Sequence, residues 1–206
     1  MDFLLHVRDH VILAGSALAA ALAIAVPAGA AFARTRGPRD AWLAAIGTAR
    51  VVPSLAVLAL MLPLVGIGFA PAFVALTLLA IPPIAINVDA GLRSVSPALR
   101  EAARGLGMSE RQIRNRVDWP LAIPVAFAGI RTATVEVIAS ATLAGFIGGG
   151  GLGEYIINAL ASNDVPQLLE GAGGVAALAL IADGILALVE RRLSGRVASS
   201  PATAPA

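Results

Sequence analysis

Few side chains in this sequence have the type and spacing needed for covalent chemistry. His6 and His10 are four residues apart and share one face of a helix, but two ligands do not make a metal site. There are no cysteines, which excludes disulfides and cysteine-based metal sites. The glycine-rich run 148–153 lacks the Gly-Lys-Ser/Thr that completes a phosphate-binding loop, and no such motif occurs elsewhere. We therefore expect no enzymatic activity, no ATP hydrolysis, and no bound cofactor or metal.

Four ionisable residues lie inside long apolar runs, where they could form ion pairs or contact a polar solute: Arg50, Arg131, Glu136 and Asp183. Because a charge at the centre of a membrane span costs about 2.5–3.5 kcal/mol on insertion scales, each should face a partner or water. Arg131 and Glu136 are five residues apart, about 140° around a helix, and are poorly placed to pair with each other. We expect Glu136 to line a polar path, with a structural ion pair, for instance to Arg50, or a position on a dimer axis as the alternatives.

The composition places these residues in a membrane protein. Hydrophobic residues make up 58% of the 206-residue chain and charged residues 14%, and the mean hydropathy is +0.83. Soluble domains carry about 25% charged residues. The length allows one bundle of about five spans and leaves no room for a second soluble domain. We predict an all-α, polytopic membrane protein with one transmembrane domain over residues 1–193 and a disordered tail over 194–206.

The apolar segments predict spans at about 11–33, 41–65, 69–89, 120–147 and 171–190. All fifteen basic residues are arginine; twelve flank the spans on one side, only Arg8 lies on the other, and two lie within spans. Since arginine accumulates on the cytoplasmic side, the N-terminus should be outside and the C-terminus inside. A cleaved signal peptide is the alternative for the first segment, but that apolar run is too long. Pro53 and Pro63 in the second segment and Pro82-Pro83 in the third predict kinks or breaks, which are either ordinary packing features or part of a pathway.

The segment from Arg93 to Pro124 carries six arginines and should be a cytoplasmic loop. Ser96-Pro97 predicts a helix start, in which the serine hydroxyl caps free N–H groups, and Gly107 predicts its left-handed end. The sequence Ser109-Glu110-Arg111-Gln112 predicts a capping box that opens a second helix, which Trp119-Pro120 should end. Such a segment either docks to another protein or lies on anionic headgroups, and charge patterning alone does not choose between the two.

The loop resembles the EAA loop of permease subunits of ATP-binding-cassette (ABC) importers. The resemblance rests on Glu101-Ala102-Ala103, on Gly105 and Gly107, and on the apolar-proline pairs 120–121 and 123–124. It implies a type I importer permease fold in which loop 93–119 forms coupling helices that sit in a cleft of a separate cytoplasmic ATPase. The residues it assigns to ATPase coupling are Glu101, Ala102, Ala103, Arg104, Gly105, Gly107 and Met108.

Further motifs are similar to the permeases of osmoprotectant importers, which carry glycine betaine, carnitine, choline and related quaternary amines. They are the segments 52–56, 81–83, 129–134 and 141–153, and the similarity covers about residues 11–160. The sequence departs from the family at Glu136, where a neutral residue is expected. The candidate residues of the translocation path are Pro53, Ser54, Arg131 and Glu136.

The resemblance also implies the partners: two ATPase subunits below, a second permease copy or paralogue, an extracytoplasmic substrate-binding protein above, and the bilayer of a prokaryotic cell membrane. No nucleic acid is expected. With two Trp, one Tyr and six Phe, the spans lack an obvious aromatic cage, so selectivity should reside in the binding protein. The alternatives are an ABC permease for another small solute, such as an amino acid, and a self-sufficient secondary transporter or channel, for which no inverted repeat or ion site is visible.

Overall fold

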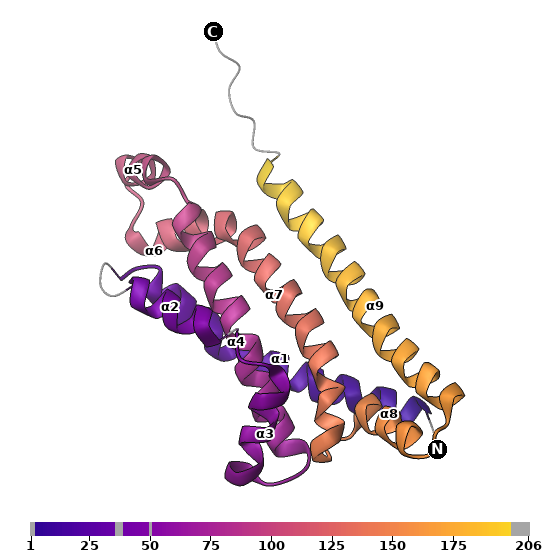
Figure 1. Ribbon diagram of the computed structural model, residues 1–206. Helices are drawn as coiled ribbons and strands as arrows, with labels where there is room; N and C mark the ends of the chain where they lie inside the picture. Colours follow the sequence, from indigo (N-terminus) through magenta and orange to yellow (C-terminus); the bar gives the residue numbers. More distant parts are fainter. Residues whose placement is uncertain (1–2, 36–38, 50, 199–206) are drawn as a thin grey trace.

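The computed structural model describes residues 3–35, 39–49 and 51–198, and in these ranges every regular element is a helix (Figure 1). The α-helices are α1 (Phe3–Phe32), α2 (Arg39–Ala49), α3 (Ser54–Val65), α4 (Phe69–Ser94), α5 (Pro97–Gly105), α6 (Glu110–Ile113), α7 (Trp119–Ala141), α8 (Gly151–Ala161) and α9 (Val165–Ala198). A π-helical turn, η1 (Arg114–Asp118), joins α6 to α7, and a 3-10 turn, η2 (Leu143–Ile147), follows α7.

Four helical segments of the described chain are long and apolar enough to cross a membrane. They are Phe3–Phe32, Phe69–Ser94, Glu110–Ala141 and Val165–Leu193. Each is at least 26 residues long, which at about 1.5 Å per residue exceeds the roughly 30 Å thickness of a hydrocarbon core. The predicted fold class, an all-α polytopic membrane protein, is confirmed.

The second predicted span is not one continuous helix. α2 ends at Ala49 and α3 begins at Ser54, so the apolar stretch 41–65 is divided in two. α3 begins directly after Pro53, whose backbone is extended. A helix does not continue through this position, because proline has no N–H to donate to the preceding turn and disfavours helical geometry in the residue before it. The 12 residues of α3 reach only about 18 Å, which is too short to span alone.

The second helix of the loop does not end at Trp119-Pro120 as predicted. It continues through η1 into α7, so that Glu110–Ala141 is one helical rod. Pro120 falls at the start of α7. The π-helical turn shifts the hydrogen-bonding pattern by one residue just before the proline, which accommodates its missing N–H without a break.

Other helix boundaries differ from the sequence prediction in the same direction, toward longer helices. α4 passes through Pro82 and Pro83 without interruption, because both rings are buried against neighbouring helices. α1 and α9 begin before their predicted spans, and α9 runs to Ala198, beyond the predicted boundary at residue 193. The predicted tail beyond Ala198 lies outside the described residues. The predicted fourth span, 120–147, is α7 followed by η2.

α4 is the central helix, packed most extensively against α7 and α1. Small residues allow the close approach: a Cβ on Gly129 of α7 would lie 2.5 Å from the Pro83 carbonyl oxygen, and one on Gly29 of α1 would lie 2.6 Å from that of Ala85. Alanines fill the same seams. Since lipid is as apolar as the side chains, such close packing rather than hydrophobic burial holds membrane helices together.

The two ends of the bundle carry different elements. In Figure 1, α5, α6 and the C-terminal part of α9 lie at the top of the view, while α3, α8 and the N-terminal end of α1 lie at the bottom. The arginine-rich loop and the described C-terminal helix end thus share one side, opposite the start of α1. The prediction likewise put the loop and the C-terminus on the side opposite the N-terminus. Following its assignment of the N-terminus to the outside, we call the two ends the outer and inner ends.

Candidate functional site

The first helix of the loop, α5, is closed by a left-handed glycine. Gly107 has φ +79°, the Met108 N–H donates to the Ala103 carbonyl at 3.1 Å, and the Gly107 N–H donates to the Arg104 carbonyl at 2.9 Å. These two bonds form a Schellman motif, which needs a residue that tolerates positive φ. The predicted stop near Gly107 is confirmed.

The start of the second helix carries the predicted capping box. The Gln112 N–H donates to the Ser109 hydroxyl at 3.4 Å, and the Ser109 N–H donates to the Gln112 side chain at 2.8 Å. At the start of α5 the predicted cap is wrong in one detail: the Ser96 hydroxyl forms no capping bond, although Pro97 is the first helical residue. The Leu99 N–H, the usual partner of such a hydroxyl, donates instead to the main-chain oxygen of Ser96 at 3.1 Å.

Arg100 attaches α5 to the rest of the bundle. Its Nε donates to Asp118 of η1 at 2.7 Å, and its Nη2 donates to the Leu92 carbonyl at the end of α4, also at 2.7 Å. A second ion pair, Arg104 to Glu110 at 2.8 Å, spans the turn between α5 and α6. The Arg100 guanidinium therefore joins α5 to the end of α4 and to η1, which leads into α7.

The outward face of α5 is open and partly apolar. Leu99 and Leu106 are exposed, at 49% and 84%, and Glu101 and Ala102 are exposed beside them. A Cβ on Gly105 would meet no atom of the described chain within 4 Å.

The seven residues assigned to coupling do not all lie on this face. Ala103 points inward and is 5% exposed, and Met108 is partly buried. Glu101, Ala102 and Gly105 are exposed on this face, and Arg104 is exposed but paired with Glu110. Ala103 packs inward, and Gly107, although exposed, forms the end of the helix.

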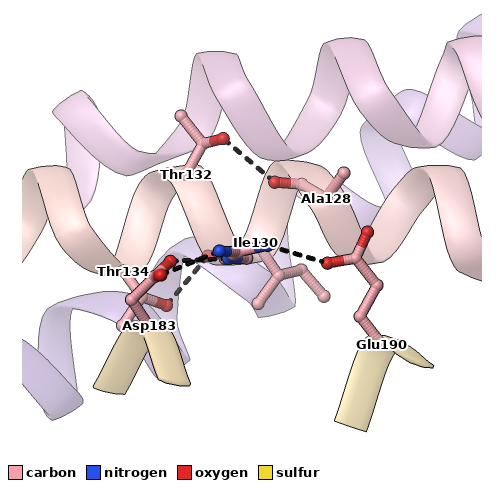
Figure 2. A network of polar contacts seen from close by, with 7 residues as sticks. Ala128, Ile130, Thr132, Thr134, Asp183 and Glu190 are labelled. Atoms are coloured by element: carbon pink, nitrogen blue, oxygen red, sulfur yellow. Dashed lines mark hydrogen bonds and ion pairs between the residues drawn. The ribbon is translucent and has the colours of Figure 1, made fainter. Parts of the chain in front are cut away.

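A network of charged side chains joins α7 to α9. The Arg131 guanidinium donates to both carboxylate oxygens of Asp183, with Nη2 to Oδ2 at 2.8 Å, and its Nη1 donates to Glu190 at 3.3 Å. Figure 2 shows Asp183 and Glu190 reaching from α9 toward α7. The expectation that Arg131 and Asp183 would each face a partner is confirmed, and that partner comes from another helix.

The other residues proposed for the path are dispersed. Pro53 is exposed and Ser54 partly exposed at the start of α3, and Glu136 is partly buried on α7. The suggested partner of Glu136, Arg50, lies outside the described residues. The structure therefore brings Arg131 together with α9 and does not place Pro53 and Ser54 beside it.

Two groups of functional interest were not predicted from the sequence. Glu190, the last residue of the predicted fifth span, was not singled out, yet it lies seven residues, about two helical turns, after Asp183 and so shares its face. That spacing could have indicated a pair of carboxylates facing one neighbour. The Arg100–Asp118 bond gave no such signal, because its partners are 18 residues apart across two turns.

Residues 17–195 match the family described as "Binding-protein-dependent transport system inner membrane component". Among curated proteins, the chain is 38% identical over 193 residues to the glycine betaine/carnitine/choline transport system permease protein OpuCB of Bacillus subtilis, covering 94% of this chain and 89% of that protein. It is 38% identical with the same 94% and 89% coverage to the choline transport system permease protein OpuBB of B. subtilis. To the osmoprotectant import permease protein OsmY of Salmonella typhimurium it is 39% identical over 196 residues, covering 94% and 83%.

The fold is shared with a solved transporter. A chain of the MetNI methionine ABC transporter in an inward-facing conformation superposes with a TM-score of 0.80 at 21% identity, covering 91% of this chain and 94% of that one. At this identity the likeness concerns the fold alone, which is that of a type I importer permease. With four candidate membrane-spanning helices, the capped helix pair at one end of the bundle and a family match over residues 17–195, this chain belongs to the inner-membrane permease components of binding-protein-dependent ABC importers.

Proposed function

We propose that the chain is the permease of an importer for quaternary-amine osmoprotectants such as glycine betaine, choline or carnitine. The observation that carries the proposal is the identity of 38% or more, over at least 94% of this chain, to three permeases whose names specify these cargoes or osmoprotectants. The chain would act in a bacterial cell membrane.

The proposed mechanism requires no covalent chemistry in this chain. Two permeases form the pathway, two cytoplasmic ATPases bind below, and a substrate-binding protein delivers cargo from outside. The ATPase contacts the exposed face of α5, formed by Glu101, Ala102 and Gly105. When ATP binding closes the ATPases, α5 moves, and Arg100 carries that movement to α4 and α7. The helices then alternate between inward-open and outward-open arrangements.

Along the path we propose a role for Glu136, and for Pro53 and Ser54 at the break between α2 and α3. A half-buried carboxylate on a membrane helix favours a cationic solute, and a helix break presents main-chain groups to water. Arg131 remains a candidate, although its ion pairs to α9 favour a structural role.

Uptake by the reconstituted complex tests the cargo. The permease, its ATPase and its binding protein are assembled in liposomes, and uptake of radiolabelled glycine betaine, choline and carnitine is measured with ATP inside, with methionine as the control solute. We expect ATP-dependent uptake of at least one quaternary amine and none of methionine. ATP-dependent uptake of an amino acid with none of the three amines would overturn the cargo assignment.

A further inference from the structure

A pocket of about 280 Å³ opens at the outer end of the bundle, apart from the coupling helices and the α7–α9 ion network. It is lined by Asp9 and Ile12 of α1, Phe69 at the start of α4, and the glycine turn 148–150 between η2 and α8. Three segments distant in sequence meet there. Its volume is near the lower end of the range for small-molecule sites, roughly 300–1,000 Å³.

The glycine turn keeps this pocket free of side chains. Gly148 and Gly150 have φ +70° and +77°, which favours glycine at both positions. A Cβ on Gly149 would lie 2.9 Å from atoms of Ala144 and Ala72. The Gly68 N–H donates to the Ile147 carbonyl at 2.8 Å, which fixes the turn beside the start of α4. The glycine turn therefore forms a wall of the pocket from main-chain atoms alone, and contacts with η2 and with the start of α4 hold it in place.

The other two walls supply a negative charge and an aromatic ring. The Asp9 side chain is 47% exposed and forms an ion pair with its exposed neighbour Arg8 through one carboxylate oxygen. Such surface pairs are weak and exchange readily. Phe69 is 47% exposed and stacks on Phe73 with ring centroids 6.2 Å apart, which holds the ring in place. A carboxylate and an aromatic ring lining one small pocket are the kinds of group that bind a quaternary ammonium ion.

The electrostatics of the outer end favour the same class of ligand. In the described part of this end the acidic residues outnumber the basic ones: Arg8 stands against Asp9, Glu154, Asp164 and Glu170. A surface with excess negative charge concentrates cations before they enter a pocket.

From these observations we infer that the pocket of Asp9, Ile12, Phe69 and Gly148–Gly150 is an entry subsite for a quaternary ammonium group. The carboxylate of Asp9 balances the cation, Phe69 presents its ring to the methyl groups, and the glycine turn admits them close to the backbone. This inference rests on the proposed function and gives the permease itself a part in recognising the cargo, a selectivity that the sequence led us to place in the binding protein.

Cysteine labelling in the assembled complex tests the site, since the chain has no cysteine of its own. Ile12→Cys places a thiol in the pocket, and Leu4→Cys, at a position that is 76% exposed on the same helix but does not line the pocket, is the matched control. The rate of maleimide labelling of this subunit is measured with choline chloride and with sodium chloride at equal ionic strength, in liposomes without choline headgroups. Protection by the uncharged isostere 3,3-dimethylbutan-1-ol is measured in parallel.

We expect choline at about four times its Kd to slow labelling of Ile12→Cys about fivefold, with no effect on Leu4→Cys and little protection by the isostere. Adding Asp9→Asn or Phe69→Leu should raise the Kd for choline about tenfold, so that the same choline concentration slows labelling only about 1.4-fold, whereas Phe69→Tyr should preserve the fivefold protection. Equal protection by the isostere, or protection only by phosphatidylcholine in the bilayer, would contradict the inference.

Uptake by the unsubstituted complex separates the two proposals. If it transports a quaternary amine and that amine gives no protection at position 12, the subsite is wrong and the proposed function stands. If it transports none of the three amines, the proposed function is wrong, and protection by choline then decides the subsite separately.

Discussion

At the scale of single residues, the two charged side chains of α7 within the bundle differ in their surroundings. Arg131 is paired twice with α9, whereas Glu136 lies partly exposed on the same helix. Among the residues of α9 whose burial the structure describes, only Gly171 is buried within this chain. Polar contacts between membrane helices, worth about 0.6 to 2 kcal/mol each, then matter more than usual. The Arg131 network is best explained as the attachment of α9.

Asp183→Asn should therefore destabilise the subunit more than Glu190→Gln. The first change removes the carboxylate charge and one of the two oxygens that accept from Arg131, so that the one carboxylate left to Arg131 in this network is Glu190, at 3.3 Å. We expect a clear fall in the unfolding temperature for Asp183→Asn and a smaller one for Glu190→Gln. Thermal unfolding of the purified complex measures both. Equal effects, or none, would contradict the structural role of the pair.

Glu136→Gln should alter transport without changing the amount of assembled complex. The substitution keeps the shape of the side chain and removes its charge, so a residue that faces the path changes cargo flux, whereas a residue in an ion pair changes assembly. Uptake rate and the yield of complex after size-exclusion chromatography are measured on the same preparation. A lower yield with an unchanged rate per complex would assign Glu136 to a structural ion pair instead.

At the scale of elements, the loop between α4 and α7 is held rigid by its own hydrogen bonds, and we propose it as the coupling segment. The Schellman end of α5 and the capping box of α6 fix the turn between them, and Arg100 fixes the base of α5. The outward face has space at Gly105 for another protein to approach the backbone. α6, η1 and α7 form one continuous helical segment, Glu110–Ala141. In the proposed mechanism, movement of α5 therefore reaches the membrane without passing through a further loop.

Gly105→Trp should uncouple ATP turnover from uptake. The position has no neighbour within 4 Å in this chain, so the indole fits the isolated subunit but obstructs a closely packed ATPase. We expect a loss of most uptake with normal insertion, whereas Ser94→Trp, a change at an exposed position before α5, serves as the control. Uptake and ATP hydrolysis are measured together. Full transport by Gly105→Trp would refute the close approach.

At the scale of the whole molecule, the proposed coupling segment between α4 and α7 and the proposed cation subsite are at opposite ends of the bundle (Figure 1). α4 connects them: it begins at Phe69 beside the pocket and ends at Ser94 before α5. Its tight seams with α1 and α7 leave little room for independent movement. A displacement at the inner end is therefore expected to move α4 and its neighbours as a unit.

The permease alone should not accumulate solute. In the proposed mechanism the energy for uptake comes from the separate ATPase. Liposomes that contain only this subunit are expected to show no uptake above the background of empty liposomes, and adding the ATPase, binding protein and ATP should restore it. Concentrative uptake by the subunit alone would identify a self-sufficient transporter.

The sequence by itself determined the membrane class, the placement of the loop and the C-terminus opposite the N-terminus, and the local structure of the loop. Hydropathy and arginine placement follow from the cost of burying charge in lipid, and the ends at Gly107 and Ser109 follow from backbone sterics and capping within a few residues. Such short-range causes can be read from a single chain. The sequence patterns located the apolar segments correctly but did not show whether each forms one continuous helix. That depended on Pro53, which interrupts a helix, and on Pro120, which a π-helical turn accommodates.

Only the tertiary structure decided which distant side chains meet. Arg131 and Asp183 are 52 residues apart, and the pocket joins Asp9 to Phe69 and to the turn 148–150. In a bilayer, apolar periodicity does not indicate which helix faces touch, because lipid and protein are equally apolar. Helix contacts are instead set by small residues such as Gly29 and Gly129, whose close approach to α4 becomes visible only when the helices are packed.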